Sequence, residues 1–127
     1  MNPLFVLYVA LGGAIGSASR FAITYAVQSR AASTFPWCTL LVNVTGSFLI
    51  GLIMRHAIDT QALSHEGRLF LAVGFCGGYT TFSAFSYETI RLLEDGNHRR
   101  AALYVVTSVA LSLAATAAGF WGYRMNE

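Results

Sequence analysis

The segment from Gly74 to Glu88 constrains the fold of this chain most, because it cannot form an uninterrupted apolar helix. Its sequence is GFCGGYTTFSAFSYE, in which a glycine pair precedes a cluster of hydroxyl side chains. The apolar run around it is long enough to enter a bilayer. Hydrocarbon satisfies no backbone hydrogen bonds, so a weakened helix there needs protein or a water-filled cavity around its polar groups. The segment therefore predicts a broken membrane helix that lines a site.

The composition places this segment in a membrane protein. Hydrophobic residues make up 55% of the 127 residues, charged residues only 11%, and the mean hydropathy is +0.55. Soluble proteins carry roughly a quarter of their residues as charges. The apolar runs predict four spans, joined by links too short for a second domain, so residues 1–127 form one all-α membrane domain. The predicted spans cover residues 4–27, 37–58, 69–93 and 101–123, with the third broken.

Polar side chains recur every four residues in two of these spans, which places each set along one face of a helix. Asn43 in the second span has two interpretations, an interhelical hydrogen bond or a donor facing a polar passage, and we favour the second. The set on the fourth span extends about 18 Å along the helix axis and favours a shared polar track. The two sets are Thr39, Asn43 and Ser47 on the second span, and Tyr104, Ser108, Ser112 and Thr116 on the fourth.

The first span combines small residues with a single charge. Gly12, Gly13 and Gly16 form a small-residue face that lets another helix backbone approach closely. Arg20 lies near one end of the span. Its side chain either extends to the lipid headgroups or turns inward to a watery vestibule, and the sequence leaves both interpretations open.

The distribution of arginines favours neither orientation in the membrane. All eight basic residues are arginines, and they give a net charge of +2 against six acids. They are dispersed between apolar runs, which does not resemble a nucleic-acid-binding patch. Four short helices also cannot enclose a pore and cover their own polar faces, so we expect an antiparallel homodimer of oppositely inserted copies. One side would hold Arg55, Arg68 and Arg124, and the other Arg30, Arg91, Arg99 and Arg100, with Arg20 in addition.

The stretch from Gly74 to Ser86 closely resembles the signature of the Fluc/CrcB family of fluoride channels. The four-span layout, the Gly12-Gly13 pair with Arg20, and Asn43 fit the same family. The resemblance covers essentially the whole chain. Ala84 departs from the pattern, because many members have threonine there, but both phenylalanines of the motif are present.

The resemblance implies a multi-pass protein of the cell (inner) membrane that exports cytoplasmic fluoride passively and so confers fluoride resistance. It implies a dual-topology homodimer with two fluoride pathways and a central structural sodium ion, without an organic cofactor. Backbone carbonyls of Gly77 and Thr80 would hold the sodium ion. The side chains implied along the fluoride pathway are Asn43, Phe82, Phe85, Tyr104, Ser108, Ser112 and Thr116. Supporting polar positions are Arg20, Thr39, Thr81, Ser83 and Glu88.

These residue types suit a small, strongly hydrated anion. Hydroxyls and an amide can replace the hydrogen bonds of lost water without the trap that a buried arginine would create. Aromatic ring edges are electropositive, so Phe82 and Phe85 presented edge-on would attract the anion, although ordinary packing explains them equally well from sequence alone. We expect the glycines to free backbone carbonyls from helical hydrogen bonding, and such oxygens suit a hard cation.

Three other functions are less consistent with the sequence. A proton-coupled small multidrug transporter needs a carboxylate deep in a span, whereas Glu88 lies toward the end of the third span. A noncatalytic membrane subunit that anchors haem would place histidines within its spans. His56 instead falls at a helix end, and His65 and His98 fall in links. An enzyme is least expected, because no nucleophile, base and orienting group converge and no metal-ligand cluster is evident.

Overall fold

The computed structural model describes residues 1–30 and 33–126, and every regular element in those ranges is helical. Asn2 starts the first helix by accepting the backbone N–H of Leu4 at 3.0 Å, with Pro3 in the first turn. Ser64 caps the third helix in the same way through the N–H of Gly67. The elements are α1 (Pro3–Gln28), α2 (Trp37–Thr60), α3 (His65–Arg68), the π-helical η1 (Leu69–Cys76), α4 (Gly77–Tyr79), α5 (Phe82–Glu94), α6 (His98–Gly122) and the 3₁₀ turn η2 (Tyr123–Asn126).

Four of the described helical stretches are long and apolar enough to cross a membrane. They are Pro3–Gln28, Trp37–Thr60, His65–Glu94 and His98–Gly122, the third being made of α3, η1, α4 and α5 in succession. The four predicted spans are therefore confirmed, with limits that differ from the predicted ones by a few residues. The chain is an all-α, multi-pass membrane protein.

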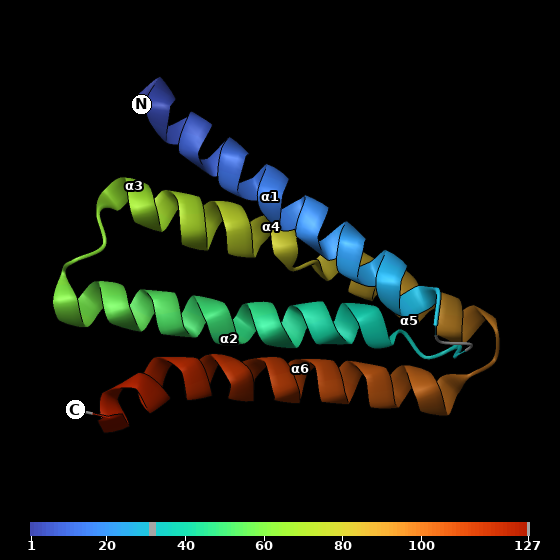
Figure 1. The fold of residues 1–127 in the computed structure, drawn as a ribbon. Helices are drawn as coiled ribbons and strands as arrows, with labels where there is room; N and C mark the ends of the chain where they lie inside the picture. Colours follow the sequence, from blue (N-terminus) through green and yellow to red (C-terminus); the bar gives the residue numbers. More distant parts are fainter. Residues whose placement is uncertain (31–32, 127) are drawn as a thin grey trace.

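The helices pack as two close pairs (Figure 1). One pair joins α1 to the η1–α4 part of the third span, and the other joins α2 to α6. The third span lies between α1 and α2, and α5 also reaches α6. Contact between the two pairs is looser than contact within them, so the seam between the pairs is where space for a site remains.

Backbone contact holds α1 against η1. A Cβ atom at Gly12 would lie 2.1 Å from the carbonyl oxygen of Phe70, a distance that no side chain tolerates. The small-residue face predicted on the first span is confirmed as a close helix–helix contact. In the other pair, the Thr116 hydroxyl of α6 donates to the Ser47 carbonyl of α2 at 3.0 Å.

The break in the third span falls at Thr80 and Thr81, after the glycine pair. Gly77 is helical, with φ −63° and ψ −38°, whereas Thr80 and Thr81 are both extended. The expectation that the glycines themselves release the backbone from helical bonding was therefore wrong. Gly78 serves close packing instead, because a Cβ atom there would lie 2.5 Å from the carbonyl oxygen of Gly13.

Candidate functional site

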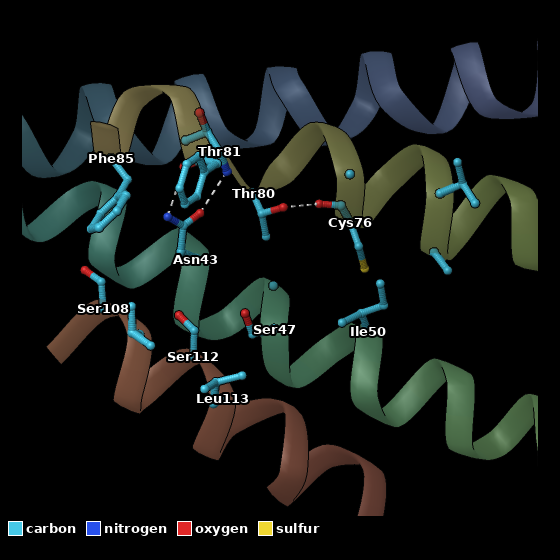
Figure 2. A pocket seen from close by; sticks show the side chains of 16 residues that line it. Asn43, Ser47, Ile50, Cys76, Thr80, Thr81, Phe85, Ser108, Ser112 and Leu113 are labelled. Atoms are coloured by element: carbon cyan, nitrogen blue, oxygen red, sulfur yellow. Dashed lines mark hydrogen bonds between the residues drawn. The ribbon is translucent and has the colours of Figure 1, made fainter. Parts of the chain in front are cut away.

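Asn43 of α2 holds the break in the third span. Its Oδ1 accepts the backbone N–H of Thr81 at 2.8 Å, and its Nδ2 donates to the carbonyl of the same residue at 3.1 Å (Figure 2). The side-chain amide thus satisfies both backbone groups of an extended residue that has left the helix. A threonine peptide without these bonds would be an unsatisfied polar group at membrane depth.

The same arrangement frees two backbone carbonyls. In a continuing helix the N–H of Thr81 would donate to the Gly77 carbonyl, but it donates to Asn43 instead. The N–H of Ala84 would likewise donate to the Thr80 carbonyl, but it donates to the Thr81 hydroxyl at 3.1 Å, which caps α5. The carbonyls of Gly77 and Thr80 therefore lose their helical donors.

A third carbonyl at the end of α4 is held by α1. The Nε of Arg20 donates to the Gly78 carbonyl at 3.2 Å, and the Ser17 hydroxyl donates to the same oxygen at 3.4 Å. The guanidinium of Arg20 thus binds the end of α4 on the neighbouring span. A cation at a helix C-terminus also interacts favourably with the helix dipole.

A cavity of about 510 Å³ lies in the seam between the helix pairs, beside the break (Figure 2). Asn43 and Ser47 of α2, Cys76 and Thr80 of the third span, and Ser112 of α6 all contribute to its wall. Aliphatic side chains make up much of the rest, so the cavity is largely apolar with a few polar groups. The lining comprises Asn43, Gly46, Ser47, Ile50, Ala72, Val73, Cys76, Gly77, Thr80, Thr81, Phe82, Phe85, Ser108, Val109, Ser112 and Leu113.

Both phenylalanines of the motif lie at this cavity. Their ring centroids are 5.5 Å apart with an interplanar angle of 47°, and Phe85 also packs 5.1 Å from the ring of Tyr104. Phe85 is half-buried, whereas Phe82 is 78% exposed. Apart from its contact with Phe85, most of the Phe82 ring is therefore left uncovered by the rest of the chain.

Ser108, one of the residues that line the cavity, carries a buried hydroxyl. Among the described residues its Oγ is the one buried side-chain polar atom without a hydrogen-bond partner. Buried hydroxyls are normally satisfied, so an unpaired one beside a cavity is suited to a water molecule or an ion. Ser112 lies one turn further along α6 on the same wall.

Several predicted pathway and supporting residues lie outside the cavity lining. The hydroxyls of Tyr104 and Thr39 each donate to the Glu88 carboxylate at 2.7 Å, and Tyr104 is fully buried. Thr39, Glu88 and Tyr104 thus join α2, α5 and α6 next to Phe85, whose ring packs against Tyr104. Thr116 bonds to the backbone of α2, as described above. The Ser83 and Thr81 hydroxyls lie 3.2 Å apart at the start of α5.

Sequence reasoning missed two contacts that shape the break. Ser17 joins Arg20 at the Gly78 carbonyl, and a spacing of three residues on one helix face was the available signal. The buried Tyr79 places its hydroxyl 2.9 Å from the Thr45 hydroxyl, directly before the break. Because Thr45 also donates to the Leu41 carbonyl, the tyrosine is the donor in this pair. No sequence pattern pointed to that partner.

Comparison with known proteins identifies the family. The family model described as "CrcB-like protein, Camphor Resistance (CrcB)" matches residues 7–120. A protein of Geobacter sulfurreducens named "Fluoride-specific ion channel FluC" is 51% identical over 119 residues, covering 94% of this chain and 96% of that protein. A protein of the same name from Thermus thermophilus is 51% identical over 120 residues, with 94% and 93% covered. Another, from Rhizobium meliloti, is 48% identical over 114 residues, with 90% and 91% covered. The chain belongs to the CrcB family.

Proposed function

We propose that this protein is a fluoride-selective channel that lets cytoplasmic fluoride leave the cell passively. The observation that carries the proposal is the cavity beside the broken helix, where hydroxyl, amide and phenyl groups meet in a member of a family whose named relatives are fluoride-specific channels. The physiological outcome would be fluoride resistance. HF enters cells from acidified medium as a neutral acid and dissociates inside, so an open anion pathway returns the fluoride.

The polar groups of the cavity match the needs of fluoride. The ion surrenders hydration as it enters, and each lost hydrogen bond has to be replaced by a donor. Asn43 uses one Nδ2 hydrogen for the Thr81 carbonyl and has a second one available. The unpaired hydroxyl of Ser108 supplies another donor, and Ser112 lies beside it.

Two further features favour passage over trapping. The rings of Phe82 and Phe85 offer electropositive edges, which attract an anion weakly and without a full charge. No arginine or histidine belongs to the cavity lining, all of which is described. A full positive charge there would bind fluoride too tightly for release, since conduction needs binding that is favourable yet reversible.

An antiparallel homodimer would complete the pathway. The cavity of one protomer is bordered by large exposed apolar side chains: Val73 is 56% exposed, Leu113 is 68% exposed, and Phe82 is more exposed still. A second copy related by a two-fold axis would cover this border and generate two equivalent pathways. The nearly balanced arginines at the two ends of the helices support insertion of the copies in opposite orientations.

The freed carbonyls of Gly77 and Thr80 fit a structural sodium ion. Hard cations prefer oxygen ligands, and these two oxygens lack the N–H donors that a continuous helix would give them. Two copies in the proposed dimer would supply four such carbonyls. No group of three histidine, cysteine or acidic side chains in the described ranges forms an alternative metal site. A bound cation would hold the two breaks together and lower the cost of an anion nearby.

Fluoride efflux from liposomes tests the proposal. Purified protein is reconstituted at low density, the vesicles are loaded with potassium fluoride, and efflux is followed with a fluoride electrode after valinomycin is added. We expect rapid fluoride release in protein-containing vesicles and none above the leak in empty ones. Vesicles loaded with chloride and read with a chloride electrode provide the control, and equal release of both anions would refute selectivity.

A further inference from the structure

Arg20 lies on α1, outside the cavity lining, yet it is bound to the helix end that borders the cavity. Four carbonyls at the C-terminus of a helix lack intrahelical donors. In this chain they belong to residues 77–80, and Arg20 and Ser17 engage only the carbonyl of Gly78. The cap formed by Arg20 and Ser17 is therefore selective, because it binds one carbonyl that lies between the two carbonyls that we assign to sodium.

We infer that Arg20, assisted by Ser17, is a positioning residue that fixes the end of α4 so that the carbonyls of Gly77 and Thr80 stay free and correctly directed for the cation. The inference rests on the sodium site of the proposed function. It adds that α1, which contributes no ligand, sets the affinity of that site through the carbonyl of Gly78.

The packing of α1 makes such control effective. Gly78 touches the backbone of Gly13, so the end of α4 cannot shift toward α1. The hydrogen bonds from Arg20 and Ser17 prevent it from shifting away. A helix end held from both sides keeps its carbonyls in one place, and coordination of a cation depends on such fixed ligand positions.

The positive charge of Arg20 also repels a nearby cation. This effect opposes the benefit of its hydrogen bond. Within residues 1–30 and 33–126 the one ion pair joins Arg55 and Asp59, so Arg20 has no carboxylate partner there. The partial negative charge of the helix C-terminus offsets about half of an elementary charge, and the half-exposed guanidinium is further screened by solvent. We therefore expect the loss of the hydrogen bond to outweigh the relief of repulsion.

Sodium-dependent stability of the purified protein tests the inference without measuring flux. The unfolding temperature is recorded in detergent over a series of sodium concentrations, with N-methylglucamine holding the ionic strength constant. Binding to the folded state raises this temperature as the site fills. For Arg20→Gln we expect the half-saturating sodium concentration to rise about tenfold, as for loss of one hydrogen bond to a charged group.

One control variant and one substitute variant separate the possible outcomes. Arg91→Gln removes an exposed arginine of α5 and should leave the sodium dependence unchanged. If Arg20→Gln does not fold, Ser17→Ala replaces it, with an expected rise of about twofold because its hydrogen bond is longer and uncharged. Unchanged or tighter sodium binding in the tested variant, with a wild type that responds to sodium, overturns the inference alone. A wild type that conducts fluoride but shows no sodium response overturns the proposed cation site itself.

Discussion

Replacing Asn43 with alanine tests whether this residue holds the break. The side-chain amide makes two hydrogen bonds to the backbone of Thr81, at 2.8 and 3.1 Å. Each buried polar group left without a partner costs about 1–3 kcal/mol, so two give about 2–6 kcal/mol. Water from the adjacent cavity can replace part of the loss. We therefore expect the free energy of unfolding of Asn43→Ala to fall by about 2–3 kcal/mol, the lower part of that range.

The assay is equilibrium unfolding in mixed detergent micelles, followed by circular dichroism as the denaturing detergent is titrated. Fluoride efflux is measured in parallel on the protein that remains folded. We expect efflux to fall as well, because the break positions Phe82 and the free carbonyls. Asn43→Asp should also impair efflux, since an ionised carboxylate repels the anion and cannot donate to the Thr81 carbonyl.

Ser47→Ala is the matched control for stability. Ser47 lies one turn further along α2 on the same cavity wall, and its hydroxyl makes no hydrogen bond with the described residues. Its loss should change the unfolding free energy by less than about 0.5 kcal/mol, as for an ordinary surface substitution. An equally small change in Asn43→Ala would refute the account of the break, even if efflux were lost.

Three further predictions concern the cavity and its supports. Phe82→Ile or Phe85→Ile should abolish or sharply reduce fluoride efflux while gel filtration still shows an intact assembly; undiminished flux would remove the rings from the pathway. Tyr104→Phe removes a 2.7 Å bond to Glu88 and should lower the unfolding free energy by about 1.5–3 kcal/mol in the same titration; an unchanged unfolding free energy would contradict a stabilising role for this bond. Gly12→Ala should yield little folded protein in a detergent-solubilised expression screen, since its Cβ would overlap a backbone oxygen; normal yields would contradict the close α1–η1 contact.

Local patterns were sufficient to predict the fold. Apolar runs of bilayer length identified four spans, and the hydroxyl cluster after Gly78 identified the interrupted one, because both signals lie within short stretches of sequence. The position of the break was less predictable. Gly78 packs against the backbone of Gly13, and both glycines of the pair are helical, whereas Thr80 and Thr81 are extended.

The residues at the site were predictable as polar faces but not as partners. A four-residue repeat places Thr39 and Asn43 on one side of α2 without saying that one binds Glu88 and the other Thr81. Tyr104 and Ser108 likewise share a face of α6, yet the first is engaged by a carboxylate and the second is unpaired. These differences arise from contacts between helices distant in sequence, which periodicity within one helix does not encode.

The reversal potential of single channels tests the central claim most directly. The protein is incorporated into a planar bilayer with a fluoride gradient across it and an opposing chloride gradient, and the voltage at which the current vanishes is recorded. A fluoride-selective channel predicts discrete current steps that reverse at the equilibrium potential of fluoride and do not shift when chloride is changed. A reversal potential that follows the chloride gradient would contradict the account. So would an absence of current, if the protein transports fluoride only when another ion moves with it.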